Sequence, residues 1–153
     1  MDRDLTFRRA RASEANAARE LIGRSMAVWD KPAGNLEEAI GLMSLSAADI
    51  ERDEAWVLDD GDHIVGFLRI SLAGSEAEIE ELHLEPEWIG RGFGRRLFEH
   101  GVERARARDA RRLIWSTDRY ALGFYLAMAG VITGSEPSGI EGDEPLTTME
   151  LRL

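Results

Sequence analysis

The residues best suited to chemistry gather in one stretch of the chain, where a predicted strand ends and a predicted helix begins. Three glycines alternate with other residues in the run Gly90-Arg91-Gly92-Phe93-Gly94. Glycine lets the backbone turn sharply and approach a ligand closely. A helix N-terminus then presents unpaired N–H groups and a positive dipole to an anion. Since Arg95 and Arg96 add positive charge there, the spacing predicts a pyrophosphate site.

The same run can also be a tight strand-to-helix connection surrounded by solvated arginines, and that alternative stays open. Two other phosphate-binding motifs do not fit. A dinucleotide fingerprint needs a third glycine where Arg95 stands, and a Walker loop needs a lysine that this segment lacks. Zinc-protease and serine-hydrolase motifs are absent from the sequence. The chain has no cysteine, which excludes a thiolate nucleophile and a cysteine-based metal site, and no metal site is expected.

Alternating strands and helices surround this stretch. We expect strands at 5–8, 55–58, 63–70, 77–84, 113–116, 131–133 and 147–153. We expect a helix after Ser13 as its N-cap, a second through residues 36–43, a capping box from Ser46 to Asp49, and helices after Gly94 and after Asp118. The successive hairpins indicate an antiparallel core within a mixed α/β sandwich.

The overall charge argues against two classes of partner. The chain has 153 residues and a formal net charge of −10, which disfavours a general nucleic-acid binder. The apolar stretches are too short to span a membrane, and the first residues carry no targeting signal. We therefore expect a cytoplasmic protein that binds neither nucleic acid nor membrane. Residues 91–112 depart from the acidic average, with eight arginines against three acids.

Two segments resemble motifs of the GNAT acyltransferase superfamily. The glycine run, preceded by Leu82-x-Leu84-x-Pro86, resembles the acetyl-CoA-binding motif written Q/R-x-x-G-x-G/A. The segment Asp118-x-x-Ala121-x-x-Phe124-Tyr125 resembles the family pattern N-x-x-A-x-x-F-Y. The element order extends the resemblance over nearly the whole chain. This sequence departs from the family at Ile89, Asp118 and Val131, and Ile89 bears on cofactor affinity.

The resemblance implies a GNAT-like three-layer α/β sandwich, with a central mixed, mostly antiparallel sheet and a splayed cofactor-binding strand. It implies one domain over residues 1–153, with possible homodimers. The implied reaction is direct transfer of an acetyl group from acetyl-CoA to a primary amine of a small molecule or peptide. The implied cofactor-binding residues are Leu82, Leu84, Ile89, Gly90, Arg91, Gly92, Phe93, Gly94, Arg95 and Asp118.

The resemblance also implies catalytic groups. Tyr125 stands at the family's conserved tyrosine, which acts as general acid on the departing thiolate. Some members use a glutamate near the splayed strand as base, so Glu80 and Glu81 are the candidates, with His83 weaker. Strand alternation sends Glu78 and Glu80 to one face and Glu81 to the other, unless a bulge intervenes.

Three hypotheses follow for the whole chain. The leading one is an acetyl-CoA-dependent N-acetyltransferase, whose acidic residues before the glycine run suit a cationic amine acceptor. The second is a non-catalytic acyl-CoA-binding or regulatory domain on the same scaffold. The third is a protein-binding module that has lost the cofactor.

Overall fold

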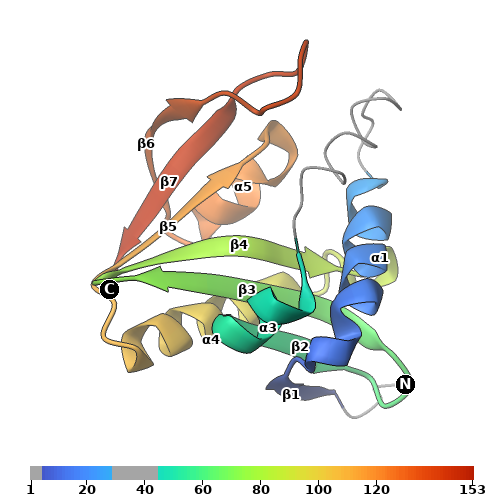
Figure 1. Cartoon of the computed structure of the whole chain (residues 1–153). Coiled ribbons are helices and arrows are strands. Elements are labelled where there is room, and N and C mark those ends of the chain that lie inside the picture. The colour runs from blue at the N-terminus through green and yellow to red at the C-terminus, as the bar shows by residue number, and fades with distance from the viewer. Residues whose placement is uncertain (1–4, 29–44) are drawn as a thin grey trace.

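The protein is built around a seven-stranded sheet with helices on both faces (Figure 1). The computed structural model describes residues 5–28 and 45–153. The strands are β1 (Thr6–Arg9), β2 (Glu54–Asp59), β3 (Ile64–Ala73), β4 (Glu76–Leu84), β5 (Arg112–Thr117), β6 (Val131–Glu136) and β7 (Leu146–Arg152). They lie in the order β1-β2-β3-β4-β5-β7-β6, and all neighbours are antiparallel except β4 and β5. The expected mixed, mostly antiparallel sheet is confirmed.

Helices cover the two faces of the sheet with two apolar clusters. On one face, α1 (Ala15–Met26) and α3 (Ala47–Arg52) bury Leu21 and Ile50 against β2 and β3. On the other face, α4 (Phe93–Ala107) and α5 (Arg119–Ala127) pack on β3, β4 and β5. Short 3-10 turns, η1 (Ala12–Glu14) and η2 (Pro86–Trp88), precede α1 and the glycine run. The result is the three-layer sandwich that the sequence predicts.

Alternation along β3 assigns its side chains to these two clusters. Phe67 packs with the α1 cluster, whereas Leu68 and Ile70 pack with the α4 cluster. Burial of each such side chain contributes about 1.5–3 kcal/mol. Arg69 lies between Leu68 and Ile70, so its side chain points to the α1 and α3 face. An arginine in this position needs buried partners.

The helix start signals in the sequence are right at one place and wrong at another. The capping box before α3 is confirmed, since Ser46 N donates to Asp49 Oδ2 at 2.9 Å and Asp49 N donates to Ser46 Oγ at 3.3 Å. Ser13 is not the cap of α1, because it lies inside η1. The Glu14 carboxylate instead accepts from Arg11 N at 2.8 Å, which starts this segment. The helix predicted through residues 36–43 lies outside the described residues.

The strands β4 and β5 share a short parallel contact and then part. They pair at three positions, Glu76 with Arg112, Ala77 with Leu113 and Glu78 with Ile114. Beyond Glu78 the two strands diverge, as Figure 1 shows. Residues 79–84 of β4 keep their pairing with β3 but have no partner in β5. The splayed strand that the sequence predicts is therefore present.

Candidate active site

The glycine run turns the chain from β4 into α4. Gly90 and Gly92 have φ angles of +80° and +87°, and Gly92 is the N-cap of α4. A Cβ added to either glycine would meet nothing within 4 Å, so the backbone conformation, not crowding, requires glycine here. The first hydrogen bond of the helix runs from Arg96 N to Gly92 O at 3.3 Å. The N–H groups of the first helical turn, before Arg96, therefore have no acceptor within the helix. They point out of its N-terminal end, where an anion would bind.

Gly94 has a different role from the other two glycines. It lies within α4, and a Cβ there would approach Phe124 Cε1 of α5 to 3.0 Å. The missing side chain lets α4 pack closely on α5. Gly94 can contribute its N–H to an anion site, while its side-chain position belongs to the core.

Aromatic rings hold the arginine beside the glycines. The Arg91 guanidinium lies 4.7 Å from the centroid of the Trp88 ring, and Trp88 in turn meets Phe93 edge-on at 5.1 Å. Ile89 packs against the core cluster of the α4 face. Arg95 is exposed and reaches Glu99 at 3.7 Å. The loop thus presents Arg91 and Arg95 around the N-terminus of α4.

The two leucines of the motif lie on the diverging part of β4. Leu82 pairs with Leu68 and Leu84 with Gly66 of β3, and neither has a partner in β5. Their side chains pack into the α4 cluster. The β5-facing backbone edge at this place is free of a strand partner within the described residues, which fits an extended ligand chain bearing amide groups.

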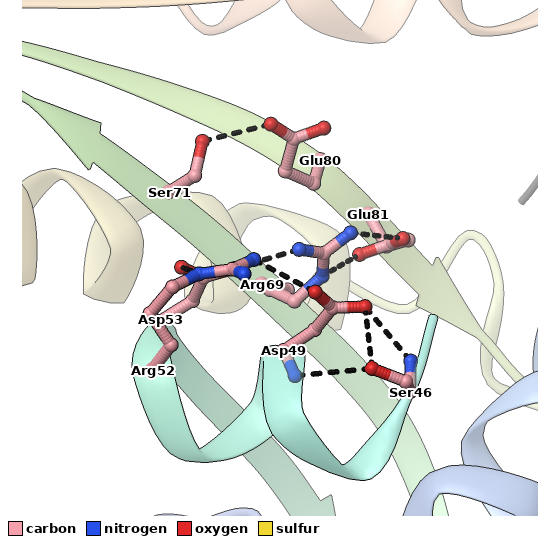
Figure 2. A network of polar contacts seen from close by, with 8 residues as sticks. All are labelled: Ser46, Asp49, Arg52, Asp53, Arg69, Ser71, Glu80 and Glu81. Atoms are coloured by element: carbon pink, nitrogen blue, oxygen red, sulfur yellow. Dashed lines mark hydrogen bonds and ion pairs between the residues drawn. The ribbon is translucent and has the colours of Figure 1, made fainter. Parts of the chain in front are cut away.

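A bulge in β4 decides where the glutamates point. Arg69 is opposite Glu81, but the next residue, Ile70, is opposite Ile79, so Glu80 is the extra residue in β4. The insertion breaks simple alternation. Figure 2 shows Glu80 and Glu81 together on the face of β3 that carries Arg69 and Ser71. Simple alternation therefore does not hold here, and the exception that a bulge allows places Glu80 and Glu81 on the same face.

Glu81 is held in a buried ion-pair network. Its carboxylate accepts from Arg69 Nε at 2.6 Å and from Arg69 Nη2 at 2.9 Å. Arg69 Nη1 also donates to Asp53 Oδ2 at 2.6 Å, at the end of α3. The side chains of Glu81 and Asp53 are each 4% exposed. Burial raises the pKa of the Glu81 carboxyl, and the Arg69 guanidinium opposes that rise.

Glu80 has a contrasting environment one residue away. Its side chain is exposed, and its Oε1 accepts a hydrogen bond from Ser71 Oγ at 2.7 Å (Figure 2). None of the nitrogen atoms of Arg69 donates to it among the described contacts. Of the two candidate bases, Glu80 is the one whose carboxylate is accessible.

Tyr125 lies on the opposite face of the sheet, in the α4 cluster. Its ring packs against Trp115 at 5.1 Å and Phe124 at 5.0 Å between centroids. Burial raises the pKa of the Tyr125 hydroxyl, with the Asp118 charge adding to the effect. A phenol in this state stays protonated at neutral pH and is suited to give a proton, not to take one.

The other sequence candidates have structural partners. Asp118 is the N-cap of α5 and accepts from the N–H groups of Tyr120 and Ala121 at 3.0 and 3.1 Å. His83 Nδ1 lies 3.3 Å from Ser25 Oγ of α1. In the described parts of the chain, no cluster of potential metal ligands forms and no helix is long and apolar enough to cross a membrane.

Sequence reasoning missed Arg69, Asp53 and Ser71. The signal for Arg69 was a single arginine within the otherwise apolar strand from Ile64 to Ile70. Such a residue is rarely buried without carboxylate partners. Nothing in the sequence marked Asp53 as a partner of Arg69 or Ser71 as a partner of Glu80.

Comparison with known proteins identifies the arrangement. The model of the acetyltransferase (GNAT) family matches residues 18–130. The putative [ribosomal protein bS18]-alanine N-acetyltransferase of Bacillus subtilis is 30% identical over 87 residues, which are 55% of this chain and 54% of that protein. The chain therefore matches about half the length of this curated relative.

Solved structures share the fold over nearly the whole chain. The PaiA N-acetyltransferase of Thermoplasma acidophilum, in complex with coenzyme A, has a TM-score of 0.81 and 14% identity, with 98% of this chain and 99% of that chain covered. The ribosomal-protein-S18-alanine N-acetyltransferase of Escherichia coli has a TM-score of 0.73 and 17% identity, with 97% and 94% covered. At these identities the structures establish the fold.

Proposed function

The chain belongs to the acetyltransferase (GNAT) family, and we propose that it transfers the acetyl group of acetyl-CoA directly to a primary amine. The main observation behind this proposal is that two structural features lie next to each other. The glycine run opens α4 where β4 ends, and β4 has parted from β5 beside it. An anion site and a free strand edge are thereby adjacent, as a long donor with a pyrophosphate and an amide-bearing arm requires.

In this proposal the glycine run holds the pyrophosphate and β4 holds the arm. The N–H groups after Gly92 and the side chains of Arg91 and Arg95 supply the anion-binding groups. The backbone of Leu82 and Leu84 pairs with the amides of the arm. Ile89 contributes apolar contact where the family pattern has a polar side chain, so the backbone N–H groups carry more of the binding.

The proposed reaction forms a C–N bond and breaks a C–S bond. The neutral amine nitrogen attacks the thioester carbonyl carbon, the sulfur leaves, and no acyl-enzyme forms. The proton lost by the nitrogen goes to Glu80, directly or through a water. Tyr125 gives its phenolic proton to the departing sulfur and regains one from solvent. Glu81 takes no part in proton transfer, because Arg69 occupies both of its oxygens.

We assign the acceptor to cationic amines, with a peptide N-terminus first among them. The relatives named for ribosomal-protein alanine acetylation support a peptide amine. Charge supports the cationic class. Burial raises the pKa of Glu78, and the neighbouring carboxylates of Glu80 and Glu136 raise it further, as expected where acidic side chains lie close together. Homodimerisation stays a prediction.

The acceptor class is tested by following release of the coenzyme A thiol. The panel contains acetyl-CoA with a peptide that begins with alanine, the same peptide with a blocked N-terminus, and spermidine. We expect release above the acceptor-free background with the free peptide or spermidine and none with the blocked peptide. Acetyl-CoA binding by calorimetry without release for any acceptor would favour the non-catalytic acyl-CoA-binding alternative.

A further inference from the structure

The bulge in β4 presents two adjacent carboxylates to one face, and the structure gives them different donors. Each of the three guanidinium nitrogens of Arg69 has a partner: Nε and Nη2 donate to Glu81, and Nη1 donates to Asp53. Glu80 receives its hydrogen bond from Ser71 on β3 instead, at 2.7 Å. The buried arginine therefore fixes one glutamate, and a neutral hydroxyl fixes the other.

This difference matters for a group that must accept a proton. A carboxylate held by a guanidinium at both oxygens is a poor base, since protonation would break two charge-assisted hydrogen bonds. A carboxylate held at one oxygen by a hydroxyl keeps its second oxygen free. In Glu80, Ser71 binds Oε1 and leaves Oε2 as the accepting atom.

We propose that Ser71 is a positioning residue for Glu80, and that its hydroxyl orients the catalytic carboxylate toward the acceptor amine. The inference rests on the proposed function, because it takes Glu80 as the base. It adds a residue from a neighbouring strand to the site. The neighbouring Arg69 pair supports it by anchoring the bulge on which Glu80 stands.

Removing the hydroxyl has a predictable effect on catalysis. The Glu80 carboxylate is exposed, and the Ser71 hydroxyl is the group that holds its Oε1. Without that hydroxyl the carboxylate can turn away from the acceptor amine, so kcat falls while acetyl-CoA binding is unchanged. A purely structural hydroxyl would change stability and leave kcat in place.

The experiment compares Ser71→Ala, Ser71→Thr, Glu80→Gln and the double variant Ser71→Ala/Glu80→Gln. The probe reaction is acetyl-CoA with whichever panel amine the wild type acetylates. We expect Ser71→Ala to lower kcat about tenfold, the effect of one hydrogen bond on a rate, with KM for acetyl-CoA unchanged. Ser71→Thr keeps a hydroxyl on a β-branched side chain suited to a strand and should restore the rate.

The most decisive comparison is between the rate of the double variant and that of Glu80→Gln. If Ser71 acts through Glu80, the double variant is no slower than Glu80→Gln alone. An unchanged rate in Ser71→Ala, or a further tenfold loss in the double variant, would overturn the inference and leave the proposed function standing. A wild-type rate in Glu80→Gln would instead remove Glu80 as base, and the inference with it. Urea unfolding of each variant separates these results from misfolding.

Discussion

Arg69 and Glu81 face each other across β3 and β4 and share two hydrogen bonds, of 2.6 and 2.9 Å, beside the extra residue of β4. The pair lies beside α3, whose C-cap residue, Asp53, accepts from the same guanidinium. The cluster ties the α3 face to the strand that carries Glu80. Its role is to hold the bulge on which Glu80 stands.

Replacing Arg69 with methionine should destabilise the protein strongly. Glu81 would stay buried without its guanidinium partner, and Asp53 would keep only the exposed Arg52. Breaking a buried ion pair from one side costs about 3–5 kcal/mol. The loss should shrink as the pH is lowered, because burial raises the pKa of the Glu81 carboxyl and the unpaired group then takes up a proton. Arg52→Met is the matched control, since Arg52 also pairs with Asp53 but is 63% exposed; it should change the free energy of unfolding little, because water screens an exposed ion pair. Equal free energies of unfolding for the two variants would contradict this role.

Gly92→Ala should weaken acetyl-CoA binding. An alanine at a φ of +87° is strained by about 1–2 kcal/mol, which relaxes by moving the N-terminus of α4. We expect KM for acetyl-CoA to rise about tenfold, the equivalent of 1.4 kcal/mol. Gly74→Ala is the control, because Gly74 has a φ of +63° and open space around it but lies in the β3–β4 turn. The same KM change in both variants would show that strain alone is responsible.

Tyr125→Phe should lower kcat and spare acetyl-CoA binding. The pKa of Tyr125 is raised by burial, so its hydroxyl is protonated and available as the acid. We expect a loss of about 100-fold, within the range for removal of a general acid. The chain has one other tyrosine, Tyr120, whose hydroxyl accepts from Arg119 at 3.1 Å. Tyr120→Phe should keep the wild-type kcat, and a wild-type kcat in Tyr125→Phe would remove Tyr125 from the mechanism.

Glu78→Gln should raise the free energy of unfolding and weaken recognition of the acceptor. Burial and the like charges of Glu80, Glu136 and Glu76 raise the pKa of Glu78, so its ionised form opposes folding as pH rises above the ordinary value of 4.5. The variant should therefore be more stable than the wild type at pH 7 and equally stable at pH 3.

The same substitution should reduce kcat/KM for a cationic acceptor, and more so at low salt. Glu103→Gln makes an equal charge change at an exposed position of α4, across the sheet, and should leave kcat/KM unchanged. Equal effects of the two variants would remove Glu78 from acceptor recognition.

The sequence predicted the parts of this site that depend on local signals. Neighbouring residues indicate the glycine run before α4, the capping box at Ser46 and the succession of strands along the chain. The splay of β4 from β5 followed from the family resemblance. Each was confirmed because nothing distant in the chain opposes it.

The arrangement of the glutamates could not be predicted in the same way. The bulge at Glu80 depends on the register of β3 against β4, and alternation alone gave the wrong face for Glu81. The partners of Arg69 come from residues 12 and 16 positions away, on two different elements. The prediction of Ser13 as the cap of α1 was wrong for a similar reason. The Glu14 carboxylate, which starts this segment instead, is held by Arg8 of β1.

Direct acetyl transfer is tested by measuring both products of one reaction. Coenzyme A thiol and acetylated peptide are quantified together, with wild type and Glu80→Gln side by side, on a peptide with a free N-terminal alanine. If Glu80 is the base of a direct transfer, the two products form in equal amounts and the variant is about 100-fold slower. Thiol release without acetylated amine, or a variant as fast as the wild type, would contradict direct transfer with Glu80 as the base.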